Sequence, residues 1–199
     1  PADVANRAVA VIDVLRASTT IATAIANGAR AVVPFASSEE VVSRGTSLGK
    51  GAAKLAGERK MLAIPGFDFG NSPLQFTAEA VEGQTILMST TNGTAAILAV
   101  QGARDVIIAS YVNFSAVLSM LRAALRGATD VAIVCAGTER QFSLEDAACA
   151  GRFVHHLVKG RREAEPTDAA PAASLLHGKY GDNLARLFAA ASHGKALAA

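Results

Sequence analysis

Short runs of apolar, mostly β-branched residues alternate along this chain with longer segments of helical character, and this alternation limits the possible folds more than any other feature. We expect strands at Ala8–Asp13, Ala31–Phe35, Thr85–Ser89, Asp105–Ala109 and Asp130–Ala136, with a weaker one at Met61–Ile64. We expect helices at Thr19–Asn27, Ser38–Leu48, Thr94–Gln101, Phe114–Arg126 and Leu144–Val158. Most of the strands are apolar throughout, which is typical of strands covered on both faces. The pattern predicts an α/β fold, a three-layer α/β/α sandwich around a mostly apolar central sheet, although it does not determine the strand order.

The length of the chain, 199 residues, suits one domain, with two lobes as a possible variation. The segment Arg161–Ala173 is polar and rich in proline and alanine, so we expect a surface connection there. Two further helical segments are expected near Ala172–His177 and Asp182–Ala191. The hypothesis is therefore a single domain over residues 1–199.

Charge and composition exclude several classes of function. The net charge is only +2 and aromatic residues make up 5% of the chain, so neither a basic surface nor a base-stacking platform for nucleic acid is expected. No apolar run approaches the ~18 residues of a membrane-spanning helix, and no signal-peptide pattern opens the chain. Two cysteines make no disulfide framework. We therefore expect no nucleic-acid partner, no membrane association and a cytoplasmic location.

Polar residues gather where the predicted strands end. Asp13 and Arg16 follow the first strand, Thr90–Thr94 follows Thr85–Ser89, and Thr138 follows the strand that contains Cys135. Because ligands of α/β proteins bind outside the carboxyl ends of strands, these loops together favour one composite site. Hydroxyls, an arginine and glycine-rich backbone suit phosphate oxygens. The alternative for each loop alone is an ordinary turn with a capping hydroxyl.

Carboxylates are the second polar theme. Asp13 ends an apolar strand, Asp68 lies in a loop rich in glycine and proline, and Glu145 and Asp146 lie in the first turn of a predicted helix. Mg²⁺ needs only one or two such carboxylates beside water and substrate oxygens, so these residues are candidate ligands. The alternatives are a favourable interaction of Glu145 and Asp146 with the helix dipole and a turn role for Asp68.

Read in order, the motifs are DVLRASTT at 13–20, GER at 57–59, IPGFDFGNSP at 64–73, TTNGT at 90–94, CAGT at 135–138, FSLED at 142–146 and CAG at 149–151. This series closely resembles the 2-phosphosulfolactate phosphatase family. The resemblance implies a three-layer α/β/α fold with the family's own strand order. It also implies Mg²⁺-dependent hydrolysis of the phosphate monoester of 2-phospho-3-sulfolactate to sulfolactate and phosphate, in the pathway to coenzyme M, and a homodimer. Relative to the family the chain lacks a first short strand and a final segment. It departs at Lys60-Met61, at Gln75 and at Glu139–Gln141, where small residues, a glutamate and a glycine are usual.

For the reaction that the resemblance implies, we assign roles to individual residues from their chemistry. Mg²⁺ is assigned to Asp13 with Glu145 and Asp146, and next to Asp68. Arg16 and Arg59 would clamp phosphoryl or acid oxygens, while Glu58 would act as a general acid or base or, preferably, hold Arg59 in place. The residues expected to bind the substrate or its phosphate are Ser18, Thr19, Asn71, Thr90, Thr91, Asn92, Gly93, Thr94 and Thr138. The identity of the nucleophile, water or a side chain, stays open.

Two alternatives to this function remain. One is a phosphatase that acts on another small phosphorylated hydroxy acid. The other is a non-catalytic protein that binds a phosphorylated metabolite, which would keep the hydroxyl- and glycine-rich loops without needing the acids. A nucleotide-binding module is disfavoured because the G-x-G-x-x-G and P-loop patterns are missing. Dependence on Mg²⁺ separates a phosphatase from a binding protein, because the phosphatase must lose turnover without the metal whereas a binder need not lose affinity.

Overall fold

The computed structural model describes residues 4–161 and 164–198. Seven strands lie at β1 Ala8–Ile12, β2 Ala31–Pro34, β3 Lys54–Arg59, β4 Leu62–Ala63, β5 Thr85–Ser89, β6 Asp105–Ala109 and β7 Val131–Cys135 among these residues. The helices are α1 Ala17–Ala26, α2 Ser38–Leu48, α3 Ala78–Val81, α4 Gly93–Ala99, α5 Phe114–Arg126, α6 Leu144–Val158, α7 Ala169–Tyr180, α8 Leu184–Ala190 and α9 Ser192–Ala198, with a 3₁₀ turn η2 at Pro73–Gln75.

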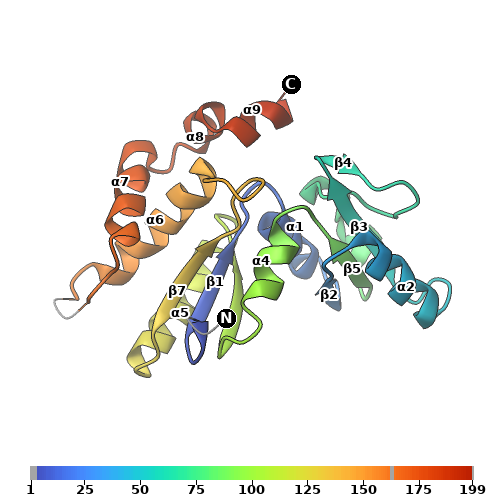
Figure 1. Ribbon diagram of the computed structural model, residues 1–199, viewed down its shortest axis with the longest axis horizontal. Coiled ribbons are helices and arrows are strands. Elements are labelled where there is room, and N and C mark those ends of the chain that lie inside the picture. The colour runs from blue at the N-terminus through green and yellow to red at the C-terminus, as the bar shows by residue number, and fades with distance from the viewer. Residues whose placement is uncertain (1–3, 162–163, 199) are drawn as a thin grey trace.

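The strands form two sheets. One has the order β6-β1-β7 and is parallel throughout, and the other has the order β2-β5-β3-β4, in which only the short β4 is antiparallel. Figure 1 shows α1 and α4 between the two sheets. The structure therefore confirms an α/β protein with helices layered on its sheets, and the strands are divided between two sheets.

Strand β1 is the centre of the packing because all five of its residues are buried. Ala10 and Ile12 pack into a hydrophobic cluster with residues of α5 and α6. Val9 and Val11 point the other way, into a second cluster that includes residues of α1, α4 and β5. Since successive side chains of a strand point to opposite faces, this apolar strand supports both clusters at once. Asp13, directly after it, is thereby fixed at a rigid position.

Most expected elements are found, and the differences have physical reasons. Strand β3, which contains the Gly-Glu-Arg motif, was not predicted because its sequence is largely polar. The weak strand at Met61–Ile64 is confirmed only as Leu62–Ala63. The expected connection at Arg161–Ala173 is too long, because α7 already begins at Ala169; residues 162–163 lie outside the described residues. The segment expected near Asp182–Ala191 is α8, and α9 follows it.

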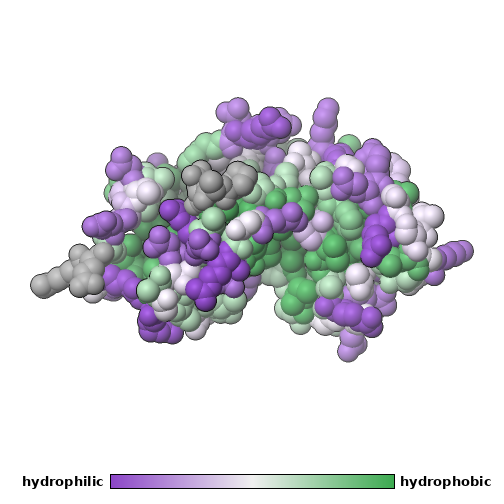
Figure 2. All heavy atoms as spheres, turned by 60° about the horizontal axis from the view of Figure 1, so that its bottom comes forward, coloured by the Kyte–Doolittle hydropathy of each residue, from purple (hydrophilic) through white to green (hydrophobic). Residues whose placement is uncertain are grey.

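One face of the molecule is partly hydrophobic. Figure 2 brings the lower side of Figure 1 forward and shows hydrophobic side chains gathered near the middle of that face, with hydrophilic ones around them. The carboxyl ends of the strands point the opposite way in Figure 1, toward α8 and α9.

No helix among the described residues is both long and apolar enough to cross a bilayer.

Candidate active site

The carboxyl ends of strands from both sheets meet around a cavity of about 420 Å³. Loops after β1, β3, β5 and β7 form its walls, and α9 contributes a further side. Its lining residues are Asp13, Leu15, Arg16, Glu58, Lys60, Met61, Asn71, Thr91, Asn92, Thr138, Glu139, Ser192, His193 and Ala196. The cavity therefore brings together seven of the residues predicted from the sequence: Asp13, Arg16, Glu58, Asn71, Thr91, Asn92 and Thr138.

Asp13 is a buried residue of this cavity lining. The turn after β1 is closed by two reciprocal bonds, in which the Asp13 amide donates to Ser18 Oγ and the Ser18 amide donates to the Asp13 carbonyl, both at 2.9 Å. The side chain faces Gly93 so closely that a Cβ at that position would collide with Asp13 Oδ2 and with the Cβ of Ala17. Gly93 is thus required by the position of the carboxylate.

The electrostatic setting of Asp13 is unusual for a carboxylate. Burial raises its pKa from 3.8 to about 7, although the Ala17 backbone amide and the Arg16 guanidinium both act to lower it. The carboxylates of Glu58 and Glu145 add to the rise. A group held in this way near neutral pH, inside a cavity, is a candidate functional group. A bound cation would stabilise its charged form.

Glu58 connects two walls of the cavity. Its carboxylate accepts hydrogen bonds from the Thr91 amide at 2.7 Å, from Thr91 Oγ1 at 3.1 Å and from the Met61 amide at 2.8 Å. The last bond closes the turn at Lys60-Met61, where both residues have positive φ. Glu58 therefore holds the β3–β4 turn against the loop after β5. The Glu58 carboxylate thus binds Thr91 and the Met61 amide, whereas the Arg59 guanidinium is held by Ser89 and by the backbone carbonyl of Glu58.

The two arginines of the predicted clamp occupy different places. Arg16 lines the cavity, and its Nη2 donates to the Met61 carbonyl at 3.1 Å, which leaves other donors of the guanidinium for a ligand. Arg59 lies outside the cavity lining and donates to the Ser89 carbonyl, to Ser89 Oγ and to the carbonyl of Glu58. Arg59 thus fastens the end of β3 to the end of β5.

The predicted hydroxyl residues divide in the same way. Thr94 and Thr90 bond reciprocally through side chains and amides at 3.0–3.1 Å, which shapes the start of α4. Ser18 Oγ donates to the Val11 carbonyl, and Thr19 Oγ1 donates to the Val14 carbonyl at 2.7 Å, so both stabilise the loop after β1. These four hydroxyl groups therefore hold the backbone of their own loops. Gly93 contributes by having no side chain, which leaves room for the Asp13 carboxylate.

The acidic pair at the start of α6 lies behind the cavity rather than in its lining. Asp146 Oδ1 accepts from the Val14 amide at 2.8 Å, and its Oδ2 accepts from the Gly137 amide at 3.1 Å. It thereby ties the loop after β1 to the loop after β7. Burial raises its pKa to about 8, and the neighbouring Asp13 carboxylate adds to this. Glu145 is also buried and lies 3.8 Å from His193, measured from Oε1 to Nδ1.

Asp68 lies away from this cluster. Its carboxylate forms an ion pair with Lys54 Nζ at 3.2 Å and accepts a hydrogen bond from the Leu55 amide at 2.8 Å. Both partners lie at the beginning of β3, whereas the cavity lies at the end of that strand. The structure gives Asp68 a role in holding its loop against β3.

The donor set of the cavity can be compared with the needs of Mg²⁺, which the resemblance implies. Asn71 is 5% exposed, and its Oδ1 is a buried oxygen without a hydrogen-bond partner in the described part of the chain. Asp13 and Asn71 both line the cavity. Within residues 4–161 and 164–198, no group of three or more histidine, cysteine or acidic side chains is arranged to hold a metal. Mg²⁺ tolerates this, since one or two protein oxygens with water and substrate oxygens suffice. The site fits Mg²⁺ on those terms.

Several cavity residues were not predicted. Lys60 and Met61 directly follow the Gly-Glu-Arg motif, and Glu139 directly follows CAGT. Their position next to a motif was the sequence feature that could have indicated them. Glu139 is held by its amide, which donates to Asn92 Oδ1 at 3.0 Å. Ser192 and His193 come from α9, and no motif at that end of the chain indicated them.

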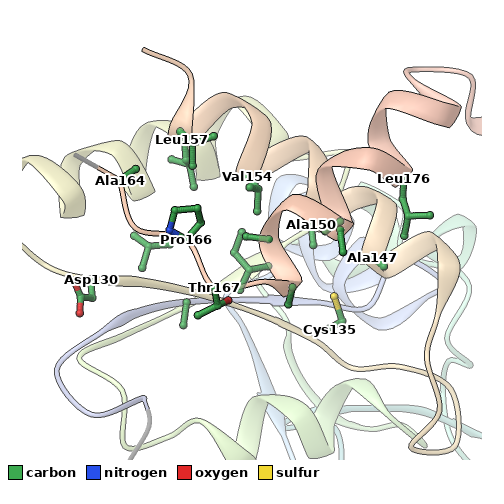
Figure 3. A pocket seen from close by; sticks show the side chains of 18 of the residues that line it. Asp130, Cys135, Ala147, Ala150, Val154, Leu157, Ala164, Pro166, Thr167 and Leu176 are labelled. Carbon is green, nitrogen blue, oxygen red and sulfur yellow. The ribbon is translucent and has the colours of Figure 1, made fainter. Parts of the chain in front are cut away.

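A second and larger cavity, of about 1500 Å³, runs beside β7. Figure 3 shows Ala147, Ala150, Val154 and Leu157 of α6 along its wall, with Cys135 bordering it. Loss of hydration, with help from the Asp146 carboxylate, raises the pKa of the Cys135 thiol to about 12, so the thiol stays protonated. This cavity lacks the grouping of Asp13, Arg16 and Glu58, and the smaller one is the better candidate site.

Comparison with known proteins shows the family of this chain. The family model described as 2-phosphosulpholactate phosphatase matches residues 1–199. The chain belongs to the 2-phosphosulfolactate phosphatase family. A probable 2-phosphosulfolactate phosphatase of Symbiobacterium thermophilum is 46% identical over 195 residues, which cover 98% of this chain and 82% of the relative. Proteins given the same name in Synechococcus sp. (strain JA-3-3Ab) and Clostridium acetobutylicum are 44% and 42% identical, over 100% and 87% of this chain and 81% and 72% of the relatives.

Proposed function

We propose that this chain hydrolyses the phosphate monoester of 2-phospho-3-sulfolactate and releases sulfolactate and phosphate. Membership of the 2-phosphosulfolactate phosphatase family and the names of its relatives support a phosphoric monoester hydrolase. One structural observation carries the proposal: the Asp13 carboxylate is held against the bare Cα of Gly93 in a cavity that Arg16 also lines. An acid of raised pKa and a guanidinium with donors left beyond its bond to the Met61 carbonyl, in one small cavity, suit a phosphoryl group.

The lining of the cavity combines three side chains that can donate N–H hydrogen bonds with three carboxylates, those of Asp13, Glu58 and Glu139. Arg16, Lys60 and His193 line it and can each offer N–H donors, while the molecule as a whole carries a net charge of only +2. A phosphate, a sulfonate and a carboxylate on one three-carbon acid need such a local concentration of donors. Because phosphoryl transfer depends mainly on positioning and charge stabilisation, these side chains supply much of what the reaction requires.

The residues around the phosphoryl position have separable tasks. Arg16 contacts phosphoryl oxygens and is itself oriented by its bond to the Met61 carbonyl. Asn92 and Thr91 line the opposite loop, and Glu58 fixes Thr91 through both its amide and its hydroxyl. Asp146 keeps the loops after β1 and β7 at a constant spacing. The walls are thus held before substrate enters, which favours a preorganised site.

We also propose that the enzyme depends on Mg²⁺, held by the Asp13 carboxylate and Asn71 Oδ1. Support comes from the raised pKa of Asp13 and the unpartnered oxygen of Asn71 in the same cavity. The cation supplies positive charge to the phosphoryl oxygens when it is bound. Glu145 and Asp146 are not needed as ligands in this arrangement, because Asp146 bonds two backbone amides and Glu145 faces His193.

The test is phosphate release from 2-phosphosulfolactate by the wild-type chain and by Asp13→Asn, each with Mg²⁺ and with EDTA. We expect turnover only for the wild type with Mg²⁺, and a variant that unfolds as cooperatively as the wild type. A folded Asp13→Asn protein that keeps Mg²⁺-dependent turnover would contradict the assignment. A wild-type chain that binds phosphate but turns over no phosphorylated acid would instead favour a phosphometabolite-binding protein.

The resemblance to the family supports two further proposals, a homodimer in the cytoplasm and a place in coenzyme M biosynthesis. Sedimentation equilibrium of the purified chain should give twice the mass of one chain. A monomer at micromolar concentration would contradict the dimer.

A further inference from the structure

Helix α9 closes one side of the cavity and brings His193 into it. Ser192, His193 and Ala196 all line the cavity, and they come from the opposite end of the chain from Asp13. The position of α9 is fixed by its packing on α8, since Leu187 is fully buried and a Cβ at Gly194 would collide with the Phe188 carbonyl. Only glycine allows this close approach, so His193 is held in a defined place.

Glu145 lies directly behind His193. Its Oε1 is 3.8 Å from His193 Nδ1, and the two side chains are only 3% and 13% exposed. Its charge is also felt at Asp13, whose pKa it helps to raise. The next residue, Asp146, accepts a hydrogen bond from the Val14 amide, so the start of α6 contacts both the loop that contains Asp13 and His193. A buried carboxylate next to an imidazole orients the ring.

We infer that His193 contacts the phosphoryl group of the substrate through Nε2, and that Glu145 is a positioning residue that acts through His193. The inference rests on the proposed function, because it names another residue of the same site. Glu145 occupies the Nδ1 side of the ring, so Nε2 is the ring nitrogen left to reach the phosphoryl group, as an N–H donor. His193 thus adds an N–H donor to the wall that faces the loops after β1 and β5.

The experiment compares variants that keep different parts of the imidazole. His193→Asn places its amide near the Nδ1 position and loses the Nε2 donor, whereas His193→Gln can place an amide N–H near the Nε2 position. Lys195→Ala is the matched control, because it removes a cation from an exposed position of the same helix that does not line the cavity. For each protein we measure kcat and KM with 2-phosphosulfolactate, the Kd of inorganic phosphate by calorimetry, and the midpoint of urea unfolding.

Loss of a hydrogen bond to a charged group is expected to raise both KM and the phosphate Kd about tenfold in His193→Asn. His193→Gln should recover part of this loss, and Lys195→Ala should match the wild type. Glu145→Gln should also raise KM, and the double variant Glu145→Gln with His193→Asn should be no worse than His193→Asn alone, because Glu145 acts through the histidine.

Unchanged KM and phosphate Kd in folded His193→Asn would overturn the inference. If that variant does not unfold cooperatively, His193→Gln is compared with a further variant, His193→Ala. Equal KM and equal phosphate Kd for these two variants would count against the Nε2 contact. A wild-type chain that binds phosphate without hydrolysing the ester refutes the proposed function, and the change in phosphate Kd then still decides the role of His193. A wild-type chain that does neither overturns both.

Discussion

Replacing Gly93 with alanine tests the close approach on which the site depends. Gly93 is the first residue of α4, and in a helix alanine is favoured over glycine by up to about 1 kcal/mol. With free space around it, Gly93→Ala would therefore raise stability. The structure has no free space there, because the new Cβ would collide with Asp13 Oδ2 and with the Cβ of Ala17, and both residues are buried. Overpacking of this kind costs about 1–3 kcal/mol.

The expected net result is a loss of up to about 2 kcal/mol in the free energy of unfolding, the overpacking cost less the helix gain. Phosphate release should fall about 100-fold, because Asp13 must move. Gly178→Ala is the control, since Gly178 lies within α7 and a Cβ there meets nothing within 4 Å. That variant should be slightly more stable than the wild type and equally active. Urea unfolding and the phosphate assay measure both, and a Gly93→Ala protein that behaves like Gly178→Ala would refute the reasoning.

Three other variants probe the same site. The pKa of Asp13 is raised to about 7 in the folded protein, so the folded state binds this proton more tightly than the unfolded state, and the free energy of unfolding should fall as pH rises from about 4 to 7. Asp13→Asn should flatten this slope in urea titrations at several pH values. Mg²⁺ should raise the unfolding temperature of the wild type at pH 8 but not that of the variant. Glu58→Gln replaces an acceptor of the Thr91 and Met61 bonds with a donor, which should cost about 1–3 kcal/mol in urea unfolding, and an unchanged midpoint would contradict the bridging role. Arg16→Lys should raise KM about tenfold with little change in stability, since lysine cannot contact phosphate and the Met61 carbonyl with one planar group, and an unchanged KM would count against the clamp.

The sequence predicts the strands of this protein well where pattern alone decides them. Five apolar runs became β1, β2, β5, β6 and β7 with boundaries within a residue or two. Strand β3 shows the limit of that reasoning. Its residues Lys54–Arg59 include a lysine, a glycine, a glutamate and an arginine, and they are extended because they pair with β5. At Gly57 a Cβ would collide with the Ser89 carbonyl, so the pairing itself requires glycine. Such a strand is defined by its neighbour rather than by its own composition.

The candidate site was predictable to the extent that it lies at strand ends. Asp13, Arg16, Glu58 and Asn71 were expected from their motifs, and the cavity joins them. The hydroxyls could not be sorted in advance, since a threonine that caps a turn, such as Thr94, has the same local sequence pattern as one that faces a ligand. Their hydrogen bonds separate the two roles.

His193 was not predictable because its place depends on distant packing. Nothing in the sequence around it indicates a ligand, and only the packing of α9 on α8 brings it to Glu145. Asp68 illustrates the converse. It lies within a motif of the family, yet the fold turns its carboxylate toward Lys54 at the other end of β3. Position within a motif and position in the cavity are therefore separate properties.

The most direct test of the central claim is kcat/KM for phosphate release from 2-phosphosulfolactate, measured beside phospholactate, which lacks the sulfonate, with Mg²⁺ or with EDTA. We predict Mg²⁺-dependent release, with kcat/KM about tenfold or more higher for the sulfonated acid because one charged hydrogen-bond partner is lost in the other. Equal values for the two acids would contradict the substrate assignment. The absence of phosphate release from either acid by the folded chain with saturating Mg²⁺ would contradict the phosphatase itself.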